Sequence, residues 1–124
     1  MRNVIVEKSF DFAVAIVKLT RKLCKISQDY ELAKQLLRSG TSIGANVSEA
    51  QQAQSRKDFV SKINIALKEA YETRYWLKLL LYVDDIHSIH HKEMIKNIEE
   101  IINLLVSIVK TTKENTKENT NANN

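Results

Sequence analysis

Proline is absent from this 124-residue chain, and glycine occurs only twice, at Gly40 and Gly44. Because proline interrupts helices and glycine favours tight turns, their scarcity allows long helices that run without a break. The single cysteine, Cys24, excludes an internal disulfide and suits a reducing compartment.

The chain also lacks long apolar segments. No run approaches the roughly 18 consecutive apolar residues of a membrane span. Charged residues at Glu7, Lys8 and Asp11 interrupt the beginning of the chain, where a secretory signal would need a continuous apolar region. We therefore expect a cytoplasmic protein with no membrane partner.

The residues that are present favour helices. The chain is 44% hydrophobic and 27% charged, which fits one domain with one core. Helical periodicity predicts helices at about 7–26, 30–50, 56–84 and 88–110, joined by short connections in which Asp29, Ser55 and Ser88 are candidate caps. Because short connections make neighbouring helices antiparallel, the predicted fold is all-α, an up-down-up-down four-helix bundle.

Two domain ranges follow from this pattern. Residues 1–110 form the predicted bundle, and residues 111–124 form a polar tail in which the sequence TKEN occurs twice. The tail contains one apolar residue and cannot support a core, so it is predicted to be disordered.

Each predicted helix has apolar residues at spacings of three and four, which mark its core-facing side. These residues are Phe12, Ile16, Leu19, Leu23 and Ile26; Leu32, Leu36, Ile43, Val47 and Ala50; Phe59, Ile63, Ala66, Ala70, Thr73, Leu77 and Leu80; and Met94, Ile98, Ile101, Leu105 and Ile108. Helix 56–84 has a second apolar line at Trp76, Leu79 and Val83. A bundle helix needs only one buried face, so the second predicts a contact between subunits.

The stretch 36–50 is the least ordinary part of the chain, because it holds both glycines in the middle of a helix. Each glycine costs about 1 kcal/mol relative to alanine in that setting. Close packing, a bend or a bulge explains such a cost, and a ligand cradle is the alternative. No strand precedes the glycines, as a phosphate-binding loop requires, so we favour close packing, with helix 56–84 as the expected neighbour.

Basic residues gather near the end of the first helix. The first 28 residues carry six Lys or Arg and two acidic residues, and that excess equals the net charge of +4 of the whole chain. The candidate nucleic-acid-binding residues are Lys18, Arg21, Lys22 and Lys25. They either bind phosphates or complement the negative end of the helix dipole.

An antiparallel pairing of helices 30–50 and 56–84 places Arg38 near Glu69 and Glu72. We expect Arg38 to pair with one of these carboxylates, and Asn46 and Glu49 to form hydrogen bonds between helices or between subunits. The interpretation we favour is a structural polar network that fixes the register of the helices. An active site with paired carboxylates is the alternative, but no activated nucleophile accompanies them.

The remaining reactive residues suggest no enzyme. His87, His90 and His91 lie with Glu93 at the start of the last helix, where a solvent-facing cap is favoured over a zinc site. Cys24 is expected to be a small core residue. No catalytic residue, metal or cofactor is predicted.

Aromatic and basic residues alternate in helix 56–84: Tyr71, Tyr75, Trp76 and Tyr82 with Lys68, Arg74 and Lys78. Such a surface can stack nucleic-acid bases. It is also typical of a helix interface with extended lysine side chains, which is the interpretation we favour.

The sequences SGTSIGANVSEA (39–50) and FVSKINIALKEAYETRYWLKLL (59–80) resemble a bacterial four-helix-bundle family whose founding members are encoded in intervening sequences of 23S ribosomal RNA genes. The resemblance covers about residues 5–110. It implies a homopentamer. A related branch, the accessory protein of diversity-generating retroelements, is a basic pentamer that binds nucleic acid and a reverse transcriptase.

Two functions are therefore expected. The first is a non-enzymatic oligomer that binds structured RNA or DNA through the four basic residues near the end of the first helix. The alternative is a structural protein–protein module that recruits a partner such as a reverse transcriptase, without direct contact with nucleic acid.

Overall fold

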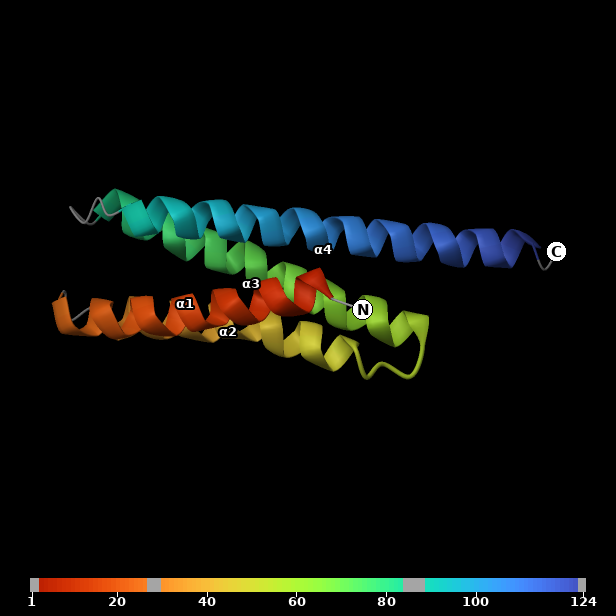
Figure 1. Cartoon of the computed structure of the whole chain (residues 1–124), viewed down its shortest axis with the longest axis horizontal. Coiled ribbons are helices and arrows are strands. Elements are labelled where there is room, and N and C mark those ends of the chain that lie inside the picture. Colours follow the sequence, from red (N-terminus) through yellow and green to blue (C-terminus); the bar gives the residue numbers. More distant parts are fainter. Residues whose placement is uncertain (1–2, 27–29, 84–88, 123–124) are drawn as a thin grey trace.

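Four α-helices make up the structure, a computed structural model that describes residues 3–26, 30–83 and 89–122. Their bounds are α1 Val4–Ile26, α2 Tyr30–Ala50, α3 Arg56–Val83 and α4 Ile89–Ala122. Successive helices run in opposite directions (Figure 1). The all-α prediction is confirmed, and no strand occurs in these ranges.

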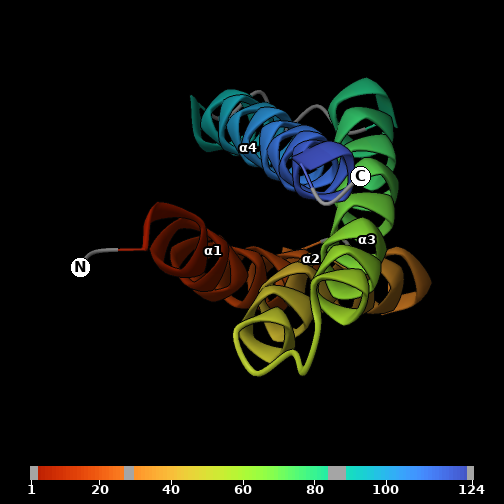
Figure 2. The same cartoon turned by 90° about the vertical axis from the view of Figure 1, so that its right-hand side faces the viewer.

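The helices pack mainly against their neighbours in sequence. α1 packs on α2, α2 on α3 and α3 on α4, while α1 and α4 close the bundle with a smaller contact. When the bundle is viewed along its long axis, α3 runs obliquely from the side of α2 to the side of α4 (Figure 2). This arrangement leaves the α1–α4 side of the bundle the least tightly joined.

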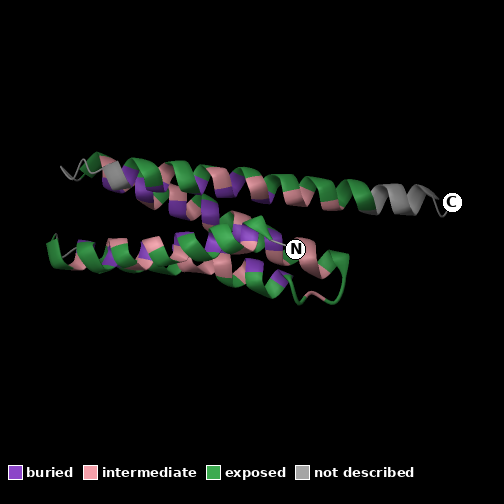
Figure 3. Ribbon diagram, viewed as in Figure 1, coloured by how far each residue is buried: buried purple, intermediate pink, exposed green. Residues whose placement is uncertain are grey.

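The core lies where the four helices overlap (Figure 3). Most of the predicted core-facing residues are buried, among them Ile16, Leu36, Ile63 and Leu105, which have no exposed surface. Ile26 differs, because its side chain at the end of α1 is 68% exposed. No helix among the described residues is both long and apolar enough to span a bilayer.

The α2–α3 connection is built without glycine or proline. Three successive backbone N–H groups, those of Gln51, Gln52 and Ala53, each donate to the carbonyl three residues earlier and so end α2 with a tightened turn. Ser55 caps α3 as predicted, because its hydroxyl accepts a hydrogen bond from the Asp58 N–H at 3.0 Å. The predicted caps at Asp29 and Ser88 lie outside the described residues.

The glycines of α2 face α1, and the expectation that they pack against α3 is wrong. A Cβ atom added to Gly40 would lie 2.8 Å from Cγ1 of Ile16, and one added to Gly44 would lie 3.2 Å from the Ser9 carbonyl oxygen. α2 continues as an α-helix through both positions. Close packing is therefore the reason for the glycines, and its partner is the helix that precedes α2.

The second apolar line of α3 is only partly covered within one chain. Trp76 and Leu79 are half-buried, and Val83 is 65% exposed. The core-facing line of the same helix is buried from Ile63 to Leu80. Both predicted faces of α3 are therefore present, and the contact between subunits stays a prediction.

α4 continues beyond the predicted helix end at Lys110 and reaches Ala122 (Figure 1). The apolar pattern does stop where expected, since Leu105 is the last buried residue among those whose side chains are described. No glycine or proline follows to interrupt the helix, so its backbone hydrogen bonds continue without a core to cover them. The end at Lys110 is thus corrected, while disorder of the tail in solution stays a prediction.

Candidate nucleic-acid interface

The predicted phosphate-binding residues are all exposed on the second half of α1: Lys18, Arg21, Lys22 and Lys25. Their spacing of three, one and three residues places them within about 100° of the helix circumference, so they share one face. None of the four forms an ion pair with the residues that the structure describes. We name this set the α1 basic face.

The helix dipole does not account for the whole α1 basic face. α1 ends at Ile26, and Lys25 is the basic residue of its last turn. The stabilisation of cations by exposed carbonyls falls off within that turn. Lys18 lies two turns from the end, so its charge has no such structural role.

The first half of α1 has a net negative charge, because it holds two acidic residues and one lysine, Lys8, which pairs with Glu100 of α4. Glu7 and Asp11 are both exposed there, one and two turns after the helix begins. The outer surface of α1 therefore changes sign along its length. An anion approaching α1 is favoured only at the end of the helix that carries the α1 basic face.

The aromatic residues of α3 divide between surface and core. Tyr71, Tyr75 and Tyr82 are 43%, 60% and 91% exposed, and their spacing of four and seven places them in one line along the helix. The Arg74 guanidinium carbon lies 5.2 Å from the centre of the Tyr71 ring, a cation–π contact. Both candidate interpretations of this surface, base stacking and a helix interface, are compatible with that geometry.

Trp76 does not belong to the exposed line. It packs against the core, and its ring centre lies 5.1 Å from that of Tyr75 in an edge-to-face arrangement. Its indole Nε1 is buried and has no acceptor within the described part of the chain.

Arg38 joins α2 to α3 through two carboxylates. Its guanidinium lies 3.1 Å from Oε2 of Glu69 and also pairs with Glu72. The Arg38 side chain is 48% exposed and that of Glu69 is 19% exposed, so the pair is half-buried. The pairing expected from the antiparallel register is present, and its role in fixing that register stays a prediction.

The two other residues of the predicted polar network behave differently. Glu49 forms an ion pair of 3.2 Å with Lys62 and thus connects α2 to α3. Asn46 donates instead to the Ser42 carbonyl at 2.8 Å, a bond within α2, and the expected hydrogen bond of Asn46 between subunits stays a prediction. The Asn46 amide reaches its own preceding turn first.

A buried polar contact escaped the sequence pattern. The hydroxyl groups of Thr73 and Ser39 lie 3.0 Å apart between α3 and α2, and both side chains are fully buried. Thr73 also lies 2.8 Å from the Glu69 carbonyl. The position of Thr73 in the predicted core-facing line could have indicated this contact, because a buried hydroxyl group needs a hydrogen-bond partner.

The histidine prediction is wrong where it can be examined. His91 is 4% exposed and belongs to the buried side of α4, because its position is three residues before the core residue Met94. His87 and the side chain of His90 lie outside the described residues. Cys24 packs against the core as predicted. Among the described residues, no three His, Cys, Asp or Glu side chains are grouped as metal ligands would be.

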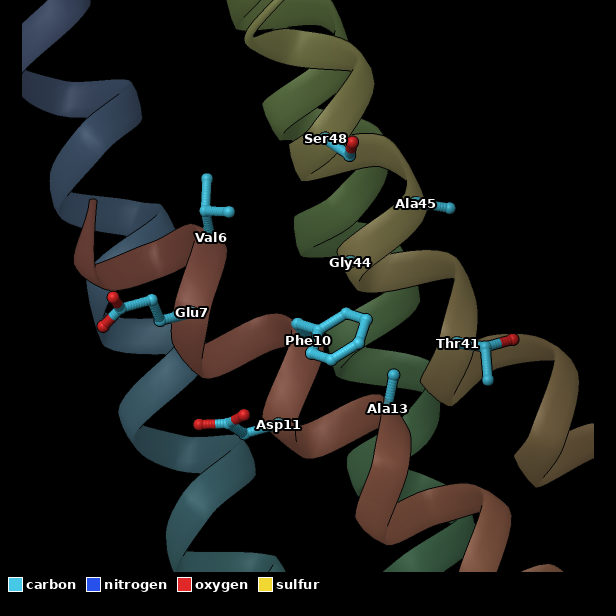
Figure 4. A pocket seen from close by; sticks show the side chains of 9 residues that line it. All are labelled: Val6, Glu7, Phe10, Asp11, Ala13, Thr41, Gly44, Ala45 and Ser48. Atoms are coloured by element: carbon cyan, nitrogen blue, oxygen red, sulfur yellow. The ribbon is translucent and has the colours of Figure 1, made fainter. Parts of the chain in front are cut away.

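A groove of about 660 Å³ lies between α1 and α2 on the outer side of the bundle. Its α2 wall consists of small residues, including Gly44, Ala45 and Ser48, and its α1 wall includes the larger side chains of Val6 and Phe10. Phe10 points from α1 toward α2 across this groove and is 67% exposed, while Glu7 points the other way (Figure 4). A large exposed aromatic beside a shallow groove is typical of a protein contact surface.

Comparisons with known proteins agree with this arrangement. The family model of the 23S rRNA-intervening sequence protein matches residues 1–107. A crystal structure of a protein of unknown function from the S23 ribosomal protein family of Bacteroides thetaiotaomicron is 50% identical, with a TM-score of 0.83, and the match covers 86% of this chain and 98% of that one. No curated protein matches the chain. Because the family model matches most of the chain, the chain belongs to the 23S rRNA-intervening sequence protein family.

Proposed function

We propose that the protein is a non-enzymatic oligomer that binds structured RNA or DNA through the α1 basic face. The observation that carries this proposal is a set of four exposed cations on one helix face, none paired with a described carboxylate. Cations left free in this way can neutralise phosphates and release their counterions, which supplies most of the free energy of sequence-tolerant binding.

Assembly would multiply this surface. The family resemblance implies a homopentamer, and a ring would present five copies of the α1 basic face to one nucleic acid. The half-covered line of α3 and the groove beside Phe10 supply apolar surface for contacts between subunits. Size-exclusion chromatography with light scattering tests this part, and a monomer at micromolar concentration would contradict it.

The binding test is a salt titration with two fluorescent probes, an RNA stem-loop and a DNA duplex of equal length. The logarithm of the affinity should fall linearly with the logarithm of the salt concentration, with a slope of about −0.9 for each phosphate contacted in the duplex. Replacing Arg21 and Lys25 by glutamine should weaken binding at least tenfold at low salt and make the slope less steep by about 2 for each subunit engaged.

The matched control removes two charges elsewhere. Lys110 and Lys113 are also exposed and lie on α4, away from the α1 basic face. Their replacement by glutamine lowers the net charge equally and should change the affinity less than threefold. Equal effects of the two double variants, or an affinity that barely changes between 50 and 200 mM salt, would contradict the proposal.

A second candidate function is supported by the tyrosine line of α3. Three exposed tyrosines beside Arg74 and Lys78 suit a protein partner, such as a reverse transcriptase, because tyrosine and arginine are enriched where proteins bind each other. In that case, Tyr71→Ala with Tyr75→Ala should abolish binding of the partner enzyme in a purified mixture. The Arg21 and Lys25 variant should leave that binding unchanged.

A further inference from the structure

The open side of the bundle contains a cavity of about 470 Å³ between the end of α1 and the beginning of α4. A smaller cavity of about 240 Å³ continues along the same seam toward the beginning of α1. The two share Ala15 of α1 and Asn97 of α4 as lining residues, so they form one groove. We name it the α1–α4 groove.

The floor of the larger cavity is apolar. Leu19, Leu23 and Ile26 contribute from α1, and Met94 contributes from α4. The exposure of Ile26, at 68%, is high for an isoleucine that lies at the edge of a core. Leu23 and Met94 are buried at the base of the cavity, so Leu19 and Ile26 supply most of the aliphatic surface that an apolar chain would cover.

The rim of the cavity is charged on the α1 side. Lys18 and Lys22 both line it, are exposed, and lie one helical turn apart, so they are neighbours on the same face of α1. Glu93 lines the opposite wall from α4. A ligand with an anionic head would therefore be held at the α1 wall, and Glu93 would oppose it.

We infer that the α1–α4 groove binds a linear amphiphile with a negatively charged head group. Its acyl chain lies on Leu19, Leu23, Ile26 and Met94, and its head group pairs with Lys18 and Lys22. A volume of about 470 Å³ is within the range of small-molecule sites. The acyl chain stays in this cavity, because the smaller cavity past Ala15 is lined by the charged residues Lys8, Asp11 and Glu100. This inference does not depend on nucleic-acid binding, because it needs the apolar floor and only two of the four cations.

The direct test uses dodecanoate as the probe, in isothermal titration calorimetry with the full chain below the micellar concentration. Dodecanoate should bind with one site for each chain, and dodecyltrimethylammonium, which has the same chain and the opposite charge, should bind at least tenfold more weakly. Affinity should rise about fourfold for each methylene between octanoate and dodecanoate, as expected for methylenes removed from water. Equal affinity for the cationic and anionic probes, or no binding of dodecanoate, would overturn the inference.

Two variants separate the floor from the rim. Ala15→Met extends a side chain into the junction of the two cavities and should weaken dodecanoate binding at least tenfold, because it shortens the space for the chain. Lys22→Gln should weaken it about fivefold to tenfold through the loss of one head-group contact. Glu93→Gln should strengthen it severalfold by removing the opposing charge.

Lys25→Gln is the matched control, since Lys25 belongs to the α1 basic face but does not line the groove. It should weaken binding of the RNA stem-loop and leave dodecanoate binding within twofold. Ala15→Met should do the reverse. If Lys25→Gln weakens dodecanoate binding and Ala15→Met leaves it unchanged, dodecanoate is attracted only to the charged surface. That result overturns the inference, whether or not the protein binds nucleic acid. Circular dichroism shows whether each variant is folded. If Ala15→Met does not fold, Lys22→Gln and Glu93→Gln still test the head-group contacts of the groove, because both residues are exposed.

Discussion

α1 packs against α2 along one side and against α4 along the other, and the two contacts differ in what lies between the helices. Beside α2, glycine replaces side chains, and the Ser9 carbonyl comes within 3.2 Å of where a Gly44 Cβ would stand. Beside α4, the cavity floor consists of aliphatic side chains, and a direct ion pair between the exposed side chains of Lys8 and Glu100 joins the two helices.

This difference shows how one helix can have a fixed side and an adaptable side. Where backbones approach closely, any added atom forces a helix to move, because interiors have no free volume. Where side chains of partly exposed residues form the contact, rotamers can change and the helices can separate slightly at low cost. A ligand groove therefore suits the α4 side of α1, and the α2 side acts as the rigid support.

The largest expected effect comes from Ile16, which is fully buried and lies against Gly40. Ile16→Ala should lower the free energy of unfolding by about 2–5 kcal/mol, the usual range for removing a buried isoleucine to the β-carbon. Chemical denaturation monitored by circular dichroism gives the value. A loss below 1 kcal/mol would show that the α1–α2 contact is not tightly packed.

Gly40→Ala sharpens this result through a double-mutant cycle. In the unaltered chain, the new methyl meets two carbons of Ile16 within 3.0 Å, so the strain should outweigh the helix-propensity gain of about 1 kcal/mol. In the Ile16→Ala background, those carbons are gone and the same substitution should stabilise the protein. An unchanged sign in the two backgrounds would contradict the packing explanation.

Gly44→Ala should cost less, about 1 kcal/mol net, because the nearest atom is farther away. The obstacle is the backbone of Ser9 and not its hydroxyl, so Ser9→Ala should not rescue the variant. Ala45→Gly, at the exposed neighbouring position, is the control: it should cost about 1 kcal/mol through propensity alone. Rescue of Gly44→Ala by Ser9→Ala would place the conflict at the side chain instead.

The burial of residues spaced three or four apart in a helix could be predicted from the sequence. Contacts that depend on how closely two helices pack could not. The core lines of α3 and α4 and the Ser55 cap follow from spacing and capping chemistry, which act within one helix. The partner of Gly40 and Gly44 depends on which way α2 is rotated between α1 and α3. Small residues give no hydrophobic signal of that rotation, so the sequence pattern assigned the glycines to the wrong neighbour.

The candidate site shows the same limit. Exposure of the α1 basic face was predictable, because cations off an apolar stripe point to solvent. The cavity beside Lys18 and Lys22 was not, since it arises from the separation of α1 and α4, two helices far apart in sequence. His91 was misplaced for a related reason: its burial depends on α4 turning it toward α1, which a cluster of histidines near a turn does not reveal.

The smallest effect should come from the α4 side of α1, at the ion pair between Lys8 and Glu100, where the charged atoms lie 3.0 Å apart and both side chains are more than 40% exposed. The hydrogen bond and the positive charge of Lys8 lower the pKa of Glu100. A carboxyl whose pKa is lower in the folded than in the unfolded state stabilises the fold above its unfolded pKa of about 4.3, and this contribution is lost as the pH falls through the folded pKa.

Glu100→Gln should therefore lower the melting temperature slightly at pH 7, and the two proteins should converge as the pH is taken below 4. Added salt should also reduce the difference, because the pair is exposed to solvent. Gly44→Ala provides the contrast. Its decrease in melting temperature arises from contact between uncharged atoms, so it should be the same at pH 7 and below pH 4. If the melting temperature of Glu100→Gln stays below that of the unaltered protein in acid, the α1–α4 side is held by packing, as the α1–α2 side is. The physical basis for an adaptable groove would then be removed.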